Sequence, residues 1–256
     1  MPRESEARHG QHFLRSPELC SQLVEAAGVG RRDLVLDLGA GTGALTCPLA
    51  ARAHRVVAVE RDPGLAARLR RRCAGLRNVE VREDDALATA LPRDPFVVVA
   101  NLPFFAAWGI LCRLLDDPYA RLQRADVVVE WGLAVARARP ARASLADALW
   151  APWYEFVLSR RLDPRVFEPP PAAAAAVLSI RSRPRPLIDP SHASEYRRFV
   201  AACHRNPQAP MKRLLRGSLG ARRWRSFASG FGLRSEARPV DLDPWQWPAL
   251  FRVRDR

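Results

Sequence analysis

The chain has 256 residues, of which 48% are hydrophobic, so it can bury a sizeable core and form one large domain with an appendage. No stretch approaches the roughly 18 consecutive apolar residues of a membrane span. The first six residues carry acids where a signal peptide needs an apolar segment, so we expect a cytoplasmic protein that does not enter a membrane. The five cysteines are scattered without a C-x-x-C pair, which excludes a disulfide framework and leads us to expect no metal site.

The formal charge at pH 7 is +14, and the sequence pI is about 11.1. A chain this basic is expected to meet a polyanion, and nucleic acid is the leading candidate. Residues 184–256 hold 15 basic and 6 acidic side chains, whereas residues 1–183 hold 26 and 21. The basic excess is therefore concentrated toward the C-terminus.

The first predicted element is a helix. Ser16 has the side chain of an N-cap, and Pro17 and Glu18 favour a first turn, so the helix should run to about Ala27. From residue 34 onward, short apolar runs alternate with amphipathic stretches, which predicts a mostly parallel sheet with helices on both faces. The expected strands are residues 34–38, 55–59, 79–82, 96–100, 126–130, 154–158 and 176–180, and the intervening helices begin near Ala44, Pro63, Phe105 and Trp131.

A proline-punctuated segment at residues 182–186 predicts a domain boundary. Beyond it the composition shifts toward arginine and helix-forming residues. We therefore expect an α/β, Rossmann-like domain with a seven-stranded sheet at residues 1–183, and a small, basic, helical domain at residues 184–256.

A glycine-rich turn at residues 39–43 follows the first predicted strand, so the backbone there can approach a ligand closely. The turn satisfies a loose dinucleotide fingerprint. Asp37, an acid at the strand end, suits a cationic ligand better than a pyrophosphate. S-adenosylmethionine carries a sulfonium and an ammonium and no phosphate, so it is the expected cofactor, and the candidate contacts are Asp37, Gly39, Gly41 and Gly43.

Acidic residues follow the next two strands. Glu60 is placed to accept both hydroxyls of a ribose, although it also reads as a surface acid. Asp85 can accept from an adenine amino group, although a helix N-cap aspartate explains it nearly as well. Arg61 and Ala86, which follow these acids in the chain, are assigned to the same cofactor site.

The tetrapeptide Asn-Leu-Pro-Phe at residues 101–104 closes a buried strand. An amine on a nucleobase is a poor nucleophile because its lone pair is delocalised into the ring. The Asn101 side-chain oxygen and the Leu102 carbonyl can each accept one of its N–H bonds, and Pro103 fixes the turn. Phe104 can stack on the base, a contact worth roughly 1–3 kcal/mol, so positioning and preorganisation would supply most of the rate. The alternative is an N-cap asparagine with a first-turn proline.

Together, the segments at residues 37–43 and 101–104 resemble the class I methyltransferases that act on adenine N6. Residues 10–14 read Gly-Gln-His-Phe-Leu and resemble the Gly-Gln-Asn-Phe-Leu motif of the rRNA adenine dimethyltransferases, which caps the methionine end of the cofactor. His12 stands where that family usually has asparagine. The resemblance assigns to the cofactor site Gln11, His12, Leu14 and also Asn101.

A Phe-x-Pro-x-Pro segment at residues 167–171 is similar to a further motif of that family. The resemblance implies that Phe167 flanks the target base opposite Phe104. The matching motifs occur in order over roughly residues 10–181. They imply that residues 1–183 form a catalytic domain that binds S-adenosylmethionine and that residues 184–256 bind RNA.

Two branches share these motifs: the small-subunit rRNA dimethyltransferases of ribosome assembly and the Erm family, which modifies 23S rRNA and confers resistance to macrolide, lincosamide and streptogramin B antibiotics. Residues 129–134 read Val-Glu-Trp-Gly-Leu-Ala and are similar to the Erm branch, as are residues 150–156. The Erm branch is therefore favoured.

The resemblance implies transfer of methyl groups to one adenine N6 of 23S rRNA, protein-free or in assembling large subunits, by a monomer. Candidate phosphate contacts in the basic tail are Arg213, Arg216, Arg222, Arg223 and Arg225, although a solvated helix face explains each equally well. The alternatives are a 16S rRNA dimethyltransferase, a dinucleotide-binding oxidoreductase and a catalytically silent RNA-binding protein. The sequence does not distinguish one added methyl group from two.

Overall fold

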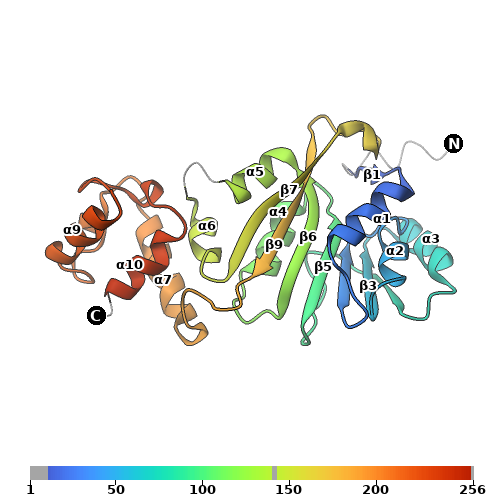
Figure 1. Ribbon diagram of the computed structural model, residues 1–256, viewed down its shortest axis with the longest axis horizontal. Helices are drawn as coiled ribbons and strands as arrows, with labels where there is room; N and C mark the ends of the chain where they lie inside the picture. The colour runs from blue at the N-terminus through green and yellow to red at the C-terminus, as the bar shows by residue number, and fades with distance from the viewer. Residues whose placement is uncertain (1–10, 140–142, 255–256) are drawn as a thin grey trace. The chain divides into compact units, whose positions relative to one another are not determined.

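Seven strands form one sheet in the computed structural model, which describes residues 11–139 and 143–254 (Figure 1). Their order across the sheet is β4-β3-β2-β5-β6-β9-β7. Pairing is parallel from β4 to β6 and antiparallel between β6 and β9. The strands are β2 (Leu34–Leu38), β3 (Arg55–Glu60), β4 (Val79–Glu83), β5 (Phe96–Asn101), β6 (Leu122–Glu130), β7 (Tyr154–Leu162) and β9 (Ala175–Ser182). The predicted α/β fold with a seven-stranded sheet is confirmed.

The apolar runs form central strands because both faces of the sheet are covered. Residues 96–100 of β5, for example, are each at most 2% exposed. The chain enters the sheet at β2, winds outward through β3 and β4, and then crosses back to β5. In such sheets, ligands bind at the carboxyl ends of the strands where the winding direction reverses, which here is the edge between β2 and β5.

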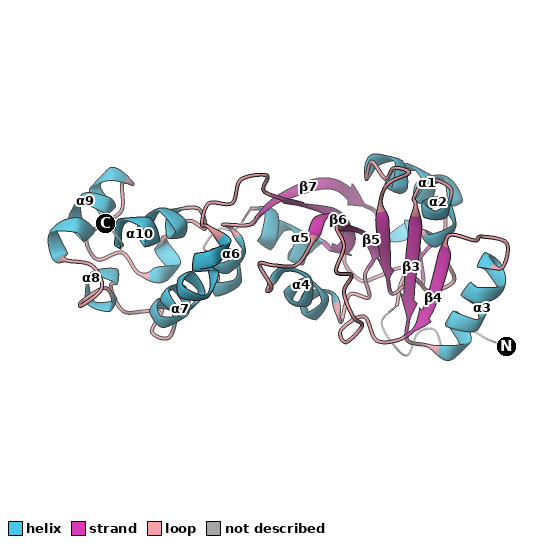
Figure 2. Ribbon diagram, turned by 90° about the horizontal axis from the view of Figure 1, so that it is seen from below, coloured by secondary structure: helices cyan, strands magenta, loops and turns pink. Residues whose placement is uncertain are grey.

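Helices cover both faces of this sheet. The N-terminal ones are α1 (Pro17–Ala26) and α3 (Pro63–Cys73), whose N-caps Ser16 and Asp62 each accept a bond from a first-turn backbone N–H. The short α2 (Thr46–Ala50) and α1 lie on one face, and α4 (Ala107–Leu115) and α5 (Trp131–Ala138) lie on the other (Figure 2). None of the described helices is long and apolar enough to cross a membrane.

The sequence did not predict a small two-stranded sheet made by β1 (Phe13–Leu14) and β8 (Phe167–Glu168). The strands are antiparallel, with Leu14 opposite Phe167. Two residues are too few to show a period in the sequence. The pairing joins the Gly-Gln-His-Phe-Leu segment to the Phe-x-Pro-x-Pro segment, about 150 residues away in the chain.

Residues 139–155 and 183–256 form a second compact unit, while residues 1–138 and 156–182 form the first. Its helices are α6 (Leu145–Trp150), α7 (Ala193–His204), α8 (Met211–Leu214), α9 (Ala221–Gly230) and α10 (Gln246–Arg254). One division falls after residue 182, near the predicted boundary, and the grouping also places residues 139–155, which the sequence analysis put in the first domain, with the second unit. They group with the second unit because Tyr196 Oη donates to the carbonyl of Ala148 at 2.6 Å, and Arg183 Nε to that of Ala151 at 2.9 Å.

A buried polar cluster ties β9 to the centre of the sheet. Asp126 of β6 is 7% exposed and accepts two hydrogen bonds from the Arg181 guanidinium of β9, at 2.8 and 3.0 Å. It also accepts from the Ser179 hydroxyl, which in turn meets Ser159 of β7 at 2.6 Å. The cluster therefore links the three strands at which the sheet changes from parallel to antiparallel.

We expect Asp126→Ala to lower the free energy of unfolding by about 2–4 kcal/mol, because Arg181 and Ser179 lose their shared acceptor in a partly buried position. Urea unfolding followed by circular dichroism measures this change. Asp163→Ala is the matched control, since Asp163 also holds an arginine bidentately but on the exposed surface. Equal losses in the two variants would show that burial does not strengthen the Asp126 cluster.

Candidate active site

The glycine loop and the tetrapeptide 101–104 touch each other at the carboxyl edge of the sheet. Gly39 has φ +74°, and a Cβ added there would lie 2.8 Å from Cδ of Pro103. Gly41 has φ +57°, and a Cβ there would lie 2.8 Å from the Phe13 ring. Glycine is needed at both positions because a side chain would be strained and would also push these neighbours away.

A small cavity opens beside this contact. Its lining includes four residues that the sequence assigned to the cofactor site: Leu14, Asp37, Gly39 and Asn101. Phe13 also lines the cavity, but the sequence analysis did not assign it to the cofactor site. Its aromatic side chain within the Gly-Gln-His-Phe-Leu segment could have indicated this role. Gly43 lies in the same loop. Gln11 immediately precedes His12, whose backbone carbonyl accepts a hydrogen bond from Asn101 of the tetrapeptide.

Asp37 is the buried acid of this cavity. It is 1% exposed, and its Oδ2 accepts a hydrogen bond from Thr46 Oγ1 at 2.7 Å. Burial raises the pKa of Asp37 to about 7, and the nearby Glu60 adds to the rise while the Thr46 bond opposes it. A cation bound in the cavity would stabilise the ionised form, so the site suits a positively charged ligand.

The burial of Glu60 rules out the alternative that it is a surface acid. It is 1% exposed rather than a surface acid, and each carboxylate oxygen accepts a backbone N–H: Oε2 from Gly41 at 2.8 Å and Oε1 from Asp62 at 2.9 Å. Glu60 therefore fixes the glycine loop onto the end of β3. Its contact with a ribose stays a prediction, which would use the remaining lone pairs of these oxygens.

Two further predicted cofactor residues, Asp85 and Ala86, lie in a turn after β4 rather than at a helix N-terminus. Asp85 Oδ1 accepts from the Leu87 backbone at 2.8 Å, and its Oδ2 lies 3.9 Å from Arg61. Arg113 of α4 holds the turn by donating to the carbonyl of Thr89 at 2.6 Å. None of the described helices begins directly after Asp85, so Asp85 is not the helix N-cap that the sequence allowed as an alternative.

Asn101 has a fixed orientation. Its Nδ2 donates to the backbone carbonyl of His12 at 2.7 Å. Because a carbonyl oxygen only accepts, the amide nitrogen must face His12 and the amide oxygen must point the other way. Among the described residues, the buried Oδ1 has no hydrogen-bond partner. The next residue is also fixed, since the Leu102 backbone donates to the carbonyl of Val128 on β6 at 3.1 Å.

Three rings gather beside Asn101. His12 Nδ1 bonds to the carbonyl of Pro169 at 2.8 Å, and its ring centroid lies 5.2 Å from that of Phe104. The Phe104 ring lies 6.2 Å from that of Phe167, edge to face. Phe167 itself is wholly buried, which differs from the expected open base-stacking face. Its stacking stays a prediction that requires Phe104 to move.

A family model described as ribosomal RNA adenine dimethylase matches residues 3–242. The chain belongs to the ribosomal RNA adenine dimethylase family. Membership in a methyltransferase family implies S-adenosylmethionine as the methyl donor, and it replaces the oxidoreductase alternative.

Two relatives represent the two branches of this dimethylase family. The chain is 36% identical to ribosomal RNA small subunit methyltransferase A of Rubrobacter xylanophilus, covering 96% of this chain and 93% of that protein. It is 31% identical to the mycinamicin-resistance protein MyrB of Micromonospora griseorubida, covering 95% and 77%. Among solved structures, it is similar to the 23S rRNA methyltransferase ErmE, with a TM-score of 0.84, 28% identity, and coverage of 95% and 100%. The Erm-type resemblance drawn from the motifs is confirmed.

The cavity residues fit the cofactor expected for a dimethylase. The glycine loop would let the backbone approach the ligand, Asp37 suits a cationic group, and Asn101, whose Oδ1 has no partner among the described residues, also lines the cavity. These residues would hold the cofactor against the tetrapeptide. The electrophilic methyl group is the chemistry that the cofactor supplies when bound.

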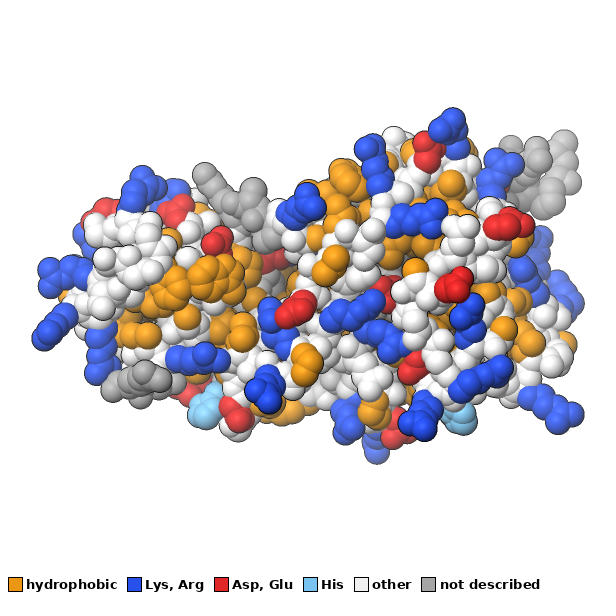
Figure 3. All heavy atoms as spheres, viewed as in Figure 1, with side chains coloured by type: hydrophobic (Ala, Val, Ile, Leu, Met, Phe, Trp, Pro, Cys, Tyr) orange, Lys and Arg blue, Asp and Glu red, His pale blue; other side chains and the backbone are white. Residues whose placement is uncertain are grey.

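The five tail arginines of this dimethylase lie in its second unit, on α8, α9 and the segment between them. All five are exposed, and none forms a salt bridge with another described residue. Basic side chains are spread over the face drawn in Figure 3 and outnumber acidic ones there. This distribution agrees with a polyanionic partner but does not single out these five.

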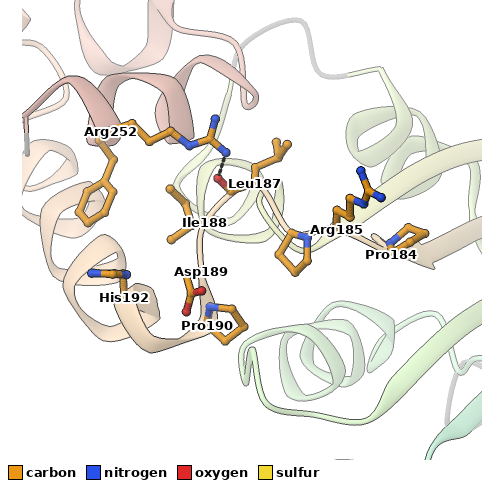
Figure 4. A pocket seen from close by; sticks show the side chains of 10 residues that line it. Pro184, Arg185, Leu187, Ile188, Asp189, Pro190, His192 and Arg252 are labelled. Carbon is orange, nitrogen blue, oxygen red and sulfur yellow. Dashed lines mark hydrogen bonds between the residues drawn. The ribbon is translucent and has the colours of Figure 1, made fainter. Parts of the chain in front are cut away.

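The second unit of the dimethylase also has a hollow of about 650 Å³ around the proline-rich segment 184–190 (Figure 4). Arg252 crosses it and donates to the carbonyl of Leu187. The hollow contains none of the predicted site residues. It is separate from the cavity at the glycine loop, whose lining comes from the first unit alone.

The raised pKa of Asp37 predicts how the stability of the cofactor-free protein changes with pH. The unfolded carboxyl ionises near pH 4 and the folded one near pH 7, so the folded state holds an extra proton between these values. Stability should therefore fall as pH rises, by roughly 2 kcal/mol between pH 5 and 8. Asp37→Asn should reduce this slope while keeping an acceptor for Thr46. Urea unfolding of both proteins at the two pH values measures the difference, and parallel curves would contradict a raised pKa.

Proposed function

We propose that this protein transfers methyl groups from S-adenosylmethionine to the N6 of one adenine in 23S rRNA, and thereby protects the ribosome from macrolide antibiotics. The observation that carries the proposal is the fixed amide of Asn101, whose buried oxygen has no partner among the described residues. The likeness to ErmE and to MyrB supports the 23S substrate. The Val-Glu-Trp-Gly-Leu-Ala segment at the end of β6 and the start of α5 supports the same branch.

The residues of the tetrapeptide act on the amine. Asn101 Oδ1 accepts one N6–H bond, and the carbonyl of Leu102, a residue whose backbone N–H is held by the Val128 carbonyl of β6, accepts the other. These two acceptors localise the lone pair of the nitrogen and aim it along one direction. The lone pair so directed would attack the methyl group that the cofactor supplies when bound, the C–S bonding pair would leave with the cofactor, and one N6 proton would pass to water.

The aromatic residues hold the base in position. Phe104 is half-buried beside Asn101, so its ring can stack on an adenine that has left the RNA helix. Phe167 would form the opposite wall only after Phe104 turns away from their edge-to-face contact. His12 limits where Phe104 can go, because its ring is itself tied to Pro169.

In this proposal, each of the two compact units has its own function. The first holds the cofactor and the reacting base, with Glu60 and Asp85 as contacts to its ribose and adenine. The second binds RNA phosphates through its exposed arginines. A cytoplasmic monomer remains the expectation for such an enzyme.

A second candidate is a 16S rRNA adenine dimethyltransferase, which the 36% identity to the Rubrobacter small-subunit enzyme favours. Methyl transfer from labelled S-adenosylmethionine to protein-free 23S and 16S rRNA, with primer extension, separates the two. We expect label on one 23S adenine, and macrolide resistance in a host that carries the gene. Label on 16S rRNA alone would overturn the 23S proposal, and label on neither would overturn both.

We expect Asn101→Ala to lower the rate of methyl transfer by roughly 100- to 1,000-fold, because the transition state loses one preorganised acceptor. Binding of S-adenosylhomocysteine should weaken by no more than about tenfold, from loss of the bond to His12. Single-turnover transfer and calorimetry give the two values. Asn78→Ala is the matched control, because Asn78 also donates to backbone carbonyls but lies outside the site. An Asn101→Ala enzyme with the wild-type rate would refute the proposed geometry.

We expect replacement of the five tail arginines by glutamine to weaken RNA binding and its salt dependence. Each lost phosphate contact should reduce the slope of log K against log salt by about 0.7 to 0.9. Filter binding from 50 to 300 mM salt measures the slope. A control replaces five exposed arginines of the first unit, Arg31, Arg32, Arg71, Arg77 and Arg93. Equal slopes in the two variants would show that the tail arginines contribute only their share of the net charge.

A further inference from the structure

Two large aromatic side chains are exposed immediately after the catalytic tetrapeptide. Phe105 is 57% exposed in the turn that leads into α4, and Trp108 is 44% exposed in the first turn of that helix. Rings of this size are usually mostly buried. Pro103 and Phe104 precede them directly, so the pair lies within a few residues of the proposed target base.

An arginine lies over each of these rings. Cζ of Arg61 is 5.8 Å from the centroid of Phe105, and Cζ of Arg137 is 5.2 Å from the centroid of Trp108. Arg61 follows β3, while Arg137 belongs to α5, so elements distant in the sequence converge here. Such cation–π contacts hold the guanidinium groups beside the rings.

Leu87 extends this surface. It is 41% exposed, and its Cδ2 would lie 2.8 Å from a Cβ added to Gly109 of α4, so it packs directly onto that helix. We call the surface formed by Arg61, Leu87, Phe105, Trp108 and Arg137 the aromatic–arginine patch. All five residues belong to the first unit, and Arg61, Leu87 and Phe105 follow the carboxyl ends of β3, β4 and β5.

The composition of the patch indicates an RNA strand as its occupant. Single exposed apolar residues need no explanation, but a cluster rimmed by charge marks an interaction site. Aromatic faces stack on bases of any sequence, and arginines pair with phosphates or stack on bases themselves. The +14 charge of the chain complements RNA and disfavours a basic or neutral protein partner. Stacking requires bases that are not paired in a helix.

We propose that the aromatic–arginine patch binds the unpaired nucleotides that flank the target adenine, with Phe105 and Trp108 stacking on their bases and Arg61 and Arg137 contacting their phosphates. This inference rests on the proposed function, because it takes the target base to lie at Phe104. The patch residues are positioning residues, which fix the strand so that the adenine reaches Asn101. The enzyme would therefore select an adenine in a loop or bulge over one in a duplex.

The test compares RNA binding of the wild type with that of Phe105→Ala/Trp108→Ala. The probes are a labelled 23S hairpin with the adenine in an unpaired loop and a fully paired duplex of the same length. We expect the wild type to prefer the hairpin, and the double variant to lose about tenfold or more of its affinity for the hairpin while binding the duplex as before. Both arginines stay in place, because Arg61 is also expected at the cofactor site.

Controls separate positioning from a structural effect. Phe105→Tyr/Trp108→Phe should restore most of the hairpin affinity, and S-adenosylhomocysteine should bind the alanine variant within about twofold of the wild type. Tyr119→Ala removes another exposed ring of the first unit, before the amino end of β6 and thus at the opposite edge of the sheet, and should leave hairpin binding unchanged. In methyl transfer, the alanine variant should show a higher KM for RNA with a smaller change in kcat.

Unchanged hairpin affinity in the alanine variant would overturn the proposal. So would sedimentation showing that the substitutions only disrupt association between copies of the chain, because the patch would then be a protein interface. The proposed function fails separately, if the wild type methylates neither rRNA. Loss of hairpin preference in the variant would in that case still show that the patch binds unpaired nucleotides, but not that they flank a target adenine.

Discussion

The candidate site depends on the hydrogen bond from Asn101 Nδ2 to the backbone carbonyl of His12. An asparagine amide can usually turn either its nitrogen or its oxygen toward a neighbour. Here the neighbour is a carbonyl, which only accepts, so the nitrogen must face His12. The amide oxygen is left buried and without a described partner, an arrangement that costs free energy until a donor arrives. In the proposed function, the target amine is such a donor. The acceptor is thus oriented before the substrate binds, which is the basis of electrostatic preorganisation.

Other contacts keep this bond in place. The pairing of β1 with β8 and the bond from His12 to Pro169 hold the His12 backbone over Asn101. On the other side, Pro103 packs against Gly39 so closely that any side chain there would displace it. The glycine loop at residues 39–43 and the tetrapeptide at residues 101–104 are therefore in direct contact. A shift of either would change the distance between the methyl group and the base.

The sequence predicted the elements that depend on local patterns, and it failed where distant contacts decide. Buried strands read as apolar runs, so the seven-stranded sheet could be predicted. The role of Glu60 could not, because its partner Gly41 is brought there by the pairing of β2 and β3. The burial of Phe167 depends on the pairing of β1 with β8, and strands of two residues are too short to show the alternating pattern that predicts a strand. Residues 139–155 run from the end of α5 to the start of β7 in the sequence, but they group with the second unit because their polar partners lie beyond residue 182.

The most direct test of this account is a crystal structure of the protein with S-adenosylhomocysteine and a short RNA that carries the target adenine in an unpaired loop. We expect adenine N6 within hydrogen-bond distance of Asn101 Oδ1 and the Leu102 carbonyl, with the bond from Nδ2 to His12 unchanged. An Asn101 amide that has turned its nitrogen toward the base, or an N6 held by other groups, would contradict it.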